Sequence, residues 1–478
     1  MGSLFKNSIF NLVYKALNVV FPLITAAYVS RVLSPAGIGE VAFAQNIVSY
    51  FVLVAGLGLI NYGTKEIGKC QTNIEQYSQI YFELFIINFI STLVCTIIYY
   101  FVISFANFFI NDKKLYLVVG LSLVFNFIQI DWFYQGIEKY QYIAVRSIIT
   151  KIICLGALIV FVKKEEDIIP FALISVLGNG FNYFFNIIQI KKYLVFSSDI
   201  LKKINIKRHI KPVIILLAST ISVQLYTKID TTMLGIFQNS KSVGYYTYAV
   251  KISDLILNLA IAVIMILLPR LSLYYYTGQT NKFKQLIEYS TEIIIFFTVP
   301  LSAGILGVAN EAVIFLFGQD FSPASITVRI LSVLIVIKAI GYLYGTQVLM
   351  TVNEEKKLLW STIAGACLNI CLNLLLIPRL EERGAAIASV ISETVVMIIQ
   401  IYCSRKYANS FIRGYKTFFK VLFGTGIMMV VIFTFDKIYP PSNLRLFFSI
   451  FIGGLVYFVI EVLLKNKIIF EFIKIIKK

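Results

Sequence analysis

The chain has 478 residues, of which 58% are hydrophobic and 14% are charged, and its mean hydropathy is +0.82. A soluble domain carries about 25% charged residues, so this composition excludes an ordinary soluble enzyme and predicts a protein embedded in lipid. The net charge of +18 would suggest nucleic acid in a soluble protein, but here it indicates cytoplasmic loops, which collect Lys and Arg.

Apolar windows long enough to span a bilayer as helices recur along the whole chain. A helix needs about 20 apolar residues to span the hydrocarbon core, and we find about 14 such windows. The sequence therefore predicts an all-α integral membrane protein. In chain order the windows are Ser8–Ser30, Gly37–Ile60, Ser78–Phe105, Leu115–Gln135, Tyr142–Val162, Ile168–Ile190, Pro212–Phe237, Val243–Leu268, Ile287–Val308, Ala324–Leu349, Leu358–Pro378, Ala385–Ser404, Thr417–Phe435 and Leu444–Leu464.

The loops predict an orientation. With the N-terminus in the cytoplasm, the inside segments hold roughly 25 Lys and Arg and the outside segments roughly 9, so both termini are expected to be cytoplasmic. The single histidine, His209, lies in the most basic inside loop, and we expect it to be solvated. That loop, residues 191–211, contains Lys191, Lys192, Lys202, Lys203, Lys207, Arg208 and Lys211.

Two short matches indicate an internal repeat. Ile38–Ala44 resembles Val243–Ala249 at an offset of 243 − 38 = 205, and Ile188–Ile190 resembles Ile399–Ile401 at 399 − 188 = 211. An even number of helices per repeat gives two halves of the same orientation, with a binding site between them. We therefore predict an N-lobe (1–190), a basic cytoplasmic loop (191–211), a C-lobe (212–404) and two additional helices with a basic tail (405–478).

No pattern in the chain is typical of catalysis or of a metal site. Cys367 and Cys371 lie one helical turn apart, but no histidine or further cysteine completes a ligand set. The acidic run 165–167 belongs to one short external loop, which we interpret as solvated. We therefore expect no catalytic residue, no bound metal and no enzymatic activity.

Charged and polar residues within the apolar windows indicate where a functional site lies. Each is costly at the bilayer centre, so it should face the bundle interior or a wet cavity. We assign six polar or basic residues to an anionic cargo and two acids to the transport of H+ or Na+, if the protein couples to an ion. The cargo residues are Lys15, Asn18, Lys228, Lys251, Arg329 and Lys338, of which the four lysines form the expected phosphate site, and the coupling acids are Asp254 and Glu393.

Other roles are open for several of these residues. Lys15 lies near a helix end and could snorkel to the interface. Lys251 and Asp254 lie one turn apart and could form a structural pair. Lys338 could pair with Glu393 instead of binding cargo.

Asp131 and Arg146 form a separate candidate. Both are about 11 Å from the turn between the fourth and fifth windows, at 1.5 Å per residue. Antiparallel neighbours at equal depth can pair, so we favour a structural or gating salt bridge over a role as cargo ligands.

The chain resembles the polysaccharide flippases of the Wzx type, in the multidrug/oligosaccharidyl-lipid/polysaccharide exporter (MOP) superfamily. The stretches that carry the resemblance are Ser30–Pro35 with Gly37, Asp131–Tyr140, Ile229-Asp230, and Val243–Tyr246 leading to Lys251-Ile252. The resemblance implies a V-shaped bundle of two six-helix lobes that alternates between inward-open and outward-open states in the bacterial cytoplasmic membrane. It also implies an undecaprenyl-diphosphate-linked oligosaccharide as cargo, for capsule, O-antigen or exopolysaccharide, with glycosyltransferases and a polysaccharide polymerase as partners.

Three alternatives stay open. Flippases for lipid II or teichoic-acid precursors share the fold and the diphosphate lipid. Cation-coupled drug exporters tend to carry an acidic residue on the first helix, where this chain has Lys15. A membrane-embedded glycan polymerase would require a long external loop with catalytic carboxylates or arginines.

Overall fold

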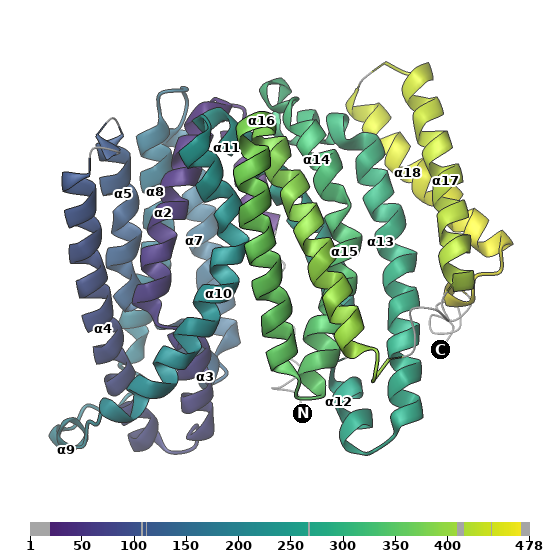
Figure 1. Ribbon diagram of the computed structural model, residues 1–478. Helices are drawn as coiled ribbons and strands as arrows, with labels where there is room; N and C mark the ends of the chain where they lie inside the picture. Colours follow the sequence, from purple (N-terminus) through teal and green to yellow (C-terminus); the bar gives the residue numbers. More distant parts are fainter. Residues whose placement is uncertain are drawn as a thin grey trace. The chain divides into compact units, whose positions relative to one another are not determined.

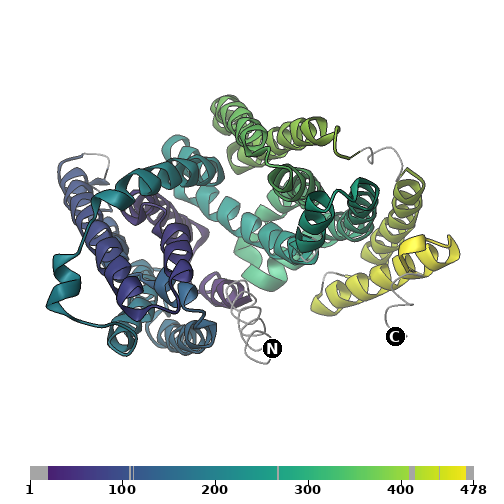
Figure 2. The ribbon, with the colours of Figure 1, turned by 90° about the horizontal axis from the view of Figure 1, so that it is seen from below.

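The computed structural model describes residues 20–106, 109–110, 112–265, 268–408, 415–440 and 442–469. In these ranges every regular element is a helix (Figure 1), so the all-α prediction is confirmed. The chain divides into two compact units, Met1–Thr232 and Met233–Lys478, and Figure 2 shows the helices of each unit roughly end on. The predicted domain boundaries stay a prediction, because this division follows packing and not membrane topology.

Unit 1 contains the N-terminal helices, and its last helix crosses the boundary between the units. Its elements are α2 (Pro35–Gly56), α3 (Leu59–Lys69), α4 (Ile74–Phe105), α5 (Lys113–Val124), the 3-10 helix η2 (Phe125–Ile128), α6 (Asp131–Gly136), α7 (Tyr140–Phe161), α8 (Ile168–Ile190), α9 (Ser198–Lys202) and α10 (Lys207–Phe237).

Local sequence explains where α2 begins and ends. The Ser34 hydroxyl accepts a hydrogen bond from the Gly37 amide at 3.3 Å, and Pro35 occupies the first helical position. Both features are typical of helix starts. Leu57 and Gly58 then adopt positive φ angles of 51° and 68°, which terminate the helix and turn the chain into α3.

The window expected as one helix over 115–135 is interrupted in the structure, so the prediction of a continuous helix was wrong there. The chain passes from α5 through η2 and two non-helical residues into α6. Asn88 on α4 donates to the carbonyl oxygens of Asn126 and Phe127 at 3.2 and 3.4 Å. A helix can break inside a membrane only where such groups satisfy the released carbonyls.

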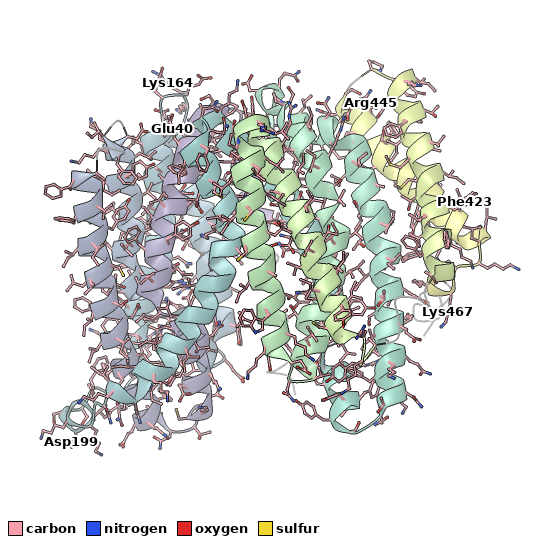
Figure 3. All side chains as sticks on the ribbon, viewed as in Figure 1. Glu40, Lys164, Asp199, Phe423, Arg445 and Lys467 are labelled. Carbon is pink, nitrogen blue, oxygen red and sulfur yellow. The ribbon has the colours of Figure 1, made fainter. Side chains whose placement is uncertain are left out.

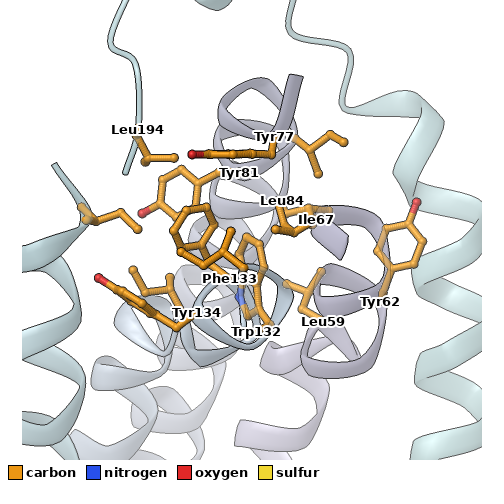
Figure 4. Packing of buried hydrophobic residues seen from close by; sticks show 14 of the residues in the cluster. Leu59, Tyr62, Ile67, Tyr77, Tyr81, Leu84, Trp132, Phe133, Tyr134 and Leu194 are labelled. Atoms are coloured by element: carbon orange, nitrogen blue, oxygen red, sulfur yellow. The ribbon is translucent and has the colours of Figure 1, made fainter. Parts of the chain in front are cut away.

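The core of unit 1 at the α3–α4 turn is an aromatic cluster that includes Tyr62, Tyr81, Trp132 and Phe133 (Figure 4). Tyr81 stacks on Trp132 with ring centroids 5.8 Å apart. Gly63 permits this packing, because a Cβ atom there would lie 2.4 Å from Cε3 of Trp132. The short helix α6 is therefore locked against α3 and α4 by ring packing.

Unit 2 contains the remaining helices. They are α11 (Ser240–Met265), α12 (Leu268–Tyr276), α13 (Thr280–Phe317), η3 (Gln319–Phe321), α14 (Ala324–Ser332), α15 (Leu334–Gly341), the π-helix η4 (Tyr342–Leu349), α16 (Glu355–Ser404), α17 (Tyr415–Ile438) and α18 (Asn443–Leu463).

Two features organise unit 2. The 50 residues of α16 contain a break at Glu381, whose φ of 52° and ψ of −131° are not helical, so α16 covers both windows predicted between 358 and 404. At the far end, Arg445 on α18 pairs with Glu311 on α13 and donates to the Tyr439 carbonyl oxygen at 2.9 Å. This buried arginine fixes the two C-terminal helices to the unit.

The helices have the length and composition of membrane spans. Among the described residues, ten helices are long and apolar enough to cross a bilayer, and α16 counts once among them. Large apolar side chains such as Phe101 and Phe423 are exposed on their outer surfaces (Figure 3 labels Phe423), as expected for side chains that face lipid. The count of about 14 windows stays a prediction, since most of the first window lies outside the described residues.

The first of the two sequence matches occupies equivalent positions in the two units. Ile38 and Val243 are each three residues beyond the first residue of their helices, since 38 − 35 and 243 − 240 are both 3. The same face of each helix is buried: Ile38, Val41 and Ala44 in α2, and Val243, Tyr246 and Ala249 in α11.

Candidate functional site

The structure places the six predicted cargo residues in different surroundings. Lys15 and Asn18 lie outside the described residues. Lys228 is half-buried on α10 in unit 1, where its carbonyl oxygen accepts from the Asn46 side chain at 3.3 Å. Asn46 also donates to the Thr232 hydroxyl at 2.7 Å, so the backbone that carries Lys228 is tied to α2.

Unit 2 brings together residues from α11, α15 and α16 into what we term the Lys338 cluster: Asp254, Lys338 and Glu393. Lys338 Nζ lies 3.4 Å from Glu393 Oε1, with side chains 32% and 16% exposed. Asp254 lies on α11, which packs against α15, the helix that carries Lys338. The alternative in which Lys338 pairs with Glu393 is therefore the arrangement observed.

Lys251 follows a different pattern from Lys338. Its ammonium group lies 4.3 Å from the ring centroid of Tyr248, one turn earlier on α11. A cation over an aromatic face is attracted by the ring but keeps N–H groups for other acceptors. Lys251 is therefore better suited than Lys338 to an anionic ligand.

Arg329 is not brought to this cluster. It is exposed on α14, nine positions before Lys338, hence about 13 Å away along the helix axis.

Unit 1 holds the Asp131 site, which consists of Asp131, Arg146 and Asn186. Arg146 Nη2 and Asn186 Nδ2 both donate to Asp131 Oδ1 at 2.8 Å. The Arg146 guanidinium also lies 5.4 Å from the centroid of the Tyr142 ring. The predicted pairing of Asp131 with Arg146 is confirmed, and its gating role stays a prediction.

The Asp131 site and the Lys338 cluster occupy equivalent positions in the repeat. Asp131 contacts Asn186 in unit 1, Lys338 contacts Glu393 in unit 2, and both members shift by the same offset, 338 − 131 = 207 and 393 − 186 = 207. This value lies between the two offsets found in the sequence.

The helix that precedes each site is interrupted in unit 1 but not in unit 2. In unit 1 α5 ends at Val124 and is followed by η2 and two non-helical residues. In unit 2 only Val333 separates α14 from α15, and it keeps helical φ and ψ angles of −64° and −29°.

The two sites differ in composition. Asp131 and Arg146 pair one acid with one base, and both are buried. The Lys338 cluster contains one lysine and two acids, and Lys251 lies one turn from Asp254 on α11. Acids inside a span are the residues that can take up a proton or another cation.

Sequence reasoning missed a third cluster, which we term the Glu83 cluster. Glu83 on α4 is fully buried, and Arg208 and His209 at the start of α10 approach its Oε2 atom at 2.5 and 2.7 Å. The Tyr62 hydroxyl lies 2.8 Å from His209 Nδ1. The expectation that His209 is solvated was wrong, because the residue is 2% exposed between these partners. Glu83 is a charged residue inside the apolar window Ser78–Phe105. The reasoning that a charge within a span should face the bundle interior would therefore have identified it.

The fold and the charged clusters within its apolar helices define a polytopic membrane transporter. The chain shares its fold with "Lipid II flippase MurJ, inward closed conformation", with a TM-score of 0.76 and 16% identity over 97% of this chain and 100% of that one. An inward-facing multidrug resistance MATE family transporter of the MOP superfamily gives a TM-score of 0.62 at 16% identity, over 81% of this chain and 94% of that one. The expected superfamily fold is confirmed.

The sequence comparisons then identify the family. The chain belongs to the family described as "Polysaccharide biosynthesis protein", which matches residues 4–274, more than half of the chain. An Escherichia coli (strain K12) protein named "Putative O-antigen transporter" is 25% identical over 410 residues, 84% of this chain and 96% of that protein. A Haloferax volcanii protein named "Probable low-salt glycan biosynthesis flippase Agl15" is 26% identical over 249 residues, 51% of this chain and 52% of that protein.

Proposed function

We propose that this protein is a flippase that moves an undecaprenyl-diphosphate-linked oligosaccharide across the bacterial cytoplasmic membrane by alternating access. The observation that carries the proposal is the similarity, over 84% of this chain, to the E. coli relative named "Putative O-antigen transporter". Membership of a polysaccharide biosynthesis family agrees with it. The product would serve the synthesis of capsule, O-antigen or exopolysaccharide.

The diphosphate is the part of the cargo that the spans can recognise by charge. Lysine follows a moving phosphate as a flexible point charge, whereas arginine prefers a fixed bidentate geometry. We assign the main phosphate contacts to Lys251 and Lys228, with Lys15 as a third. Lys338 would contribute only when its pair with Glu393 opens, and Arg329, which is exposed on α14, would meet the cargo only near the membrane boundary. Several modest contacts suit a carrier that must release its cargo.

Transport in vesicles tests this function. Purified protein is reconstituted with a fluorescent polyprenyl-diphosphate oligosaccharide, and flipping is followed by an impermeant reagent that destroys the probe in the outer leaflet. Lys228→Gln and Lys251→Gln should each reduce the rate by about tenfold, the effect of losing roughly 1.4 kcal/mol. The exposed loop variant Lys164→Gln should match the wild type.

The same vesicles separate the alternatives. Wild-type rates in folded Lys228→Gln and Lys251→Gln variants would contradict the phosphate site. Transport of lipid II or of a teichoic-acid precursor in preference to the oligosaccharide lipid would assign the protein to another diphosphate flippase. Export of organic cations without any lipid cargo would favour a drug exporter.

The Lys338 cluster is the proposed site of ion coupling. Asp254 and Glu393 are the acids within the spans that would take up H+ or Na+. Asp254→Asn or Glu393→Gln should abolish any dependence of transport on an imposed pH or sodium gradient. Unchanged dependence in both variants would leave the membrane potential or the substrate gradient as the driving force.

The remaining proposals concern surroundings and partners. We place both termini in the cytoplasm, because the basic loops then lie inside. Glycosyltransferases would supply the lipid-linked unit on that side, and a polysaccharide polymerase would consume it on the other. Protease protection of tags at the two termini in oriented membrane vesicles tests the topology.

A further inference from the structure

The segment from the end of α8 into the first turn of α10 is strongly basic. Residues 191–211 contain seven Lys or Arg and one acid, Asp199, which gives 7 − 1 = +6 with the histidine neutral. All six of its lysines are exposed: Lys191, Lys192, Lys202, Lys203, Lys207 and Lys211. Figure 3 places Asp199 at one end of unit 1 and Lys164 at the opposite end.

This linker is folded back onto α4 by its backbone. The Tyr77 hydroxyl donates to the Tyr193 carbonyl oxygen at 2.9 Å, and the Val195 amide donates to the Ser78 hydroxyl at 3.1 Å. Gln79 donates to the Lys203 carbonyl oxygen at 2.8 Å. The lysines therefore project from a fixed backbone and not from a free loop.

Glu83 is the centre of this attachment. Its buried carboxylate accepts from the Asn205 amide at 2.7 Å and from the side chains of Arg208 and His209. Because Glu83 engages Arg208, the one arginine of the linker is satisfied within the protein. The exposed lysines are the charges that face outward.

Apolar side chains are exposed on the same segment. Phe196 is 61% exposed and contacts the Phe82 ring at 5.4 Å between centroids. Val195 is also exposed, as are Ile210 and Ile214 on the first turns of α10. Exposed apolar groups beside a row of lysines match the boundary between hydrocarbon and headgroups.

We propose that the 191–211 linker is a binding surface for the headgroups of anionic phospholipids in the adjacent leaflet. Phe196 and Val195 would lie at the hydrocarbon boundary, and the lysines would contact the phosphates. Each lysine near a membrane surface raises the affinity for anionic lipid by roughly fivefold. Under the proposed topology this leaflet is the cytoplasmic one.

Quenching of tryptophan by brominated lipid tests the surface in the full-length protein. The chain has two tryptophans: Trp132 is buried, and Trp360 is 68% exposed near the start of α16. In the reporter protein, Phe196→Trp is combined with Trp360→Phe. The reference is the unaltered chain, in which Trp360 samples the general lipid mixture. Both are placed in nanodiscs of phosphatidylcholine with about one fifth brominated phosphatidylglycerol.

The quenching at each tryptophan reports the local fraction of phosphatidylglycerol. The proposal predicts that this fraction is at least threefold higher at position 196 than at Trp360. Replacing four lysines by glutamine (Lys191, Lys192, Lys202 and Lys203) should remove the excess. The matched control, Lys163→Gln with Lys164→Gln at the other end of unit 1, should retain it. Raising the salt concentration to 0.5 M should weaken it, because surface charges are then screened.

Two results would overturn the proposal: equal quenching at positions 196 and 360, or an excess that persists in the four-lysine variant. No glycan lipid is present in the experiment, so its result does not depend on whether the protein is a flippase. In a complementary experiment the phosphatidylcholine carries the bromine and the phosphatidylglycerol does not. This mixture should quench position 196 less than position 360.

Discussion

The Asp131 site offers a sharp test of how charges are held inside unit 1. The Arg146 and Asp131 side chains are 3% and 12% exposed, and they meet at 2.8 Å. Removing one member of a buried pair costs about 3–5 kcal/mol, because the other charge is left without its partner. We therefore expect Asp131→Arg and Arg146→Asp each to lower the apparent unfolding temperature by several degrees.

Reversing both charges should restore part of this stability. The pair then forms again, but Asn186 currently donates an N–H to Asp131, and it must turn its amide to offer an oxygen to the new cation. The lost charge-assisted hydrogen bond is worth about 1.5–3 kcal/mol, so recovery should be incomplete unless the amide turns. The double variant should still exceed both singles, with a coupling energy of about 2 kcal/mol or more.

Thermal unfolding of the detergent-purified protein measures these effects. The buried Trp132 lies next to Asp131 and reports local melting through its fluorescence. The control is the surface pair Lys202 and Asp199, whose side chains are 79% and 78% exposed at 3.9 Å. Its reversal should change stability by less than about 1 kcal/mol. A double reversal at Asp131 and Arg146 that is no more stable than either single would refute the pairing as the source of stability.

Three other predictions concern stability and access. Glu83→Gln should release the basic linker and speed its cleavage by trypsin, and equal cleavage in the wild type would contradict the attachment. Gly63→Ala should lower the unfolding temperature, by overpacking worth about 1–3 kcal/mol, because Trp132 must move; an unchanged melting curve would show that it can shift freely. Arg445→Ala should leave Glu311 buried without its partner and loosen α17 and α18, seen as faster hydrogen exchange in those helices, and unaltered exchange there would argue against the arginine as their anchor.

The sequence alone determined the features that depend on local pattern. Apolar windows of span length predicted helices, because a bilayer requires continuous apolar surface with internally bonded backbone. Equal depth on antiparallel neighbours predicted the contact of Asp131 with Arg146, because a short turn fixes the register of the two helices. The match of Ile38 with Val243 predicted that these residues occupy equivalent positions in two helices, because the alignment of an internal repeat can be read directly from the sequence.

Tertiary structure decided what depends on how separate helices pack. Lys338 had two possible roles, and only the packing of α15 against α16 brought it to Glu393. Glu83 finds its partners more than 120 positions away, at Asn205 and His209, a distance over which helical periodicity carries no information. The break before Asp131 likewise needs Asn88 from another helix to satisfy the freed carbonyls. Sequence patterns specify which face of a helix is polar, but the rotation and neighbours of each helix decide which charges meet.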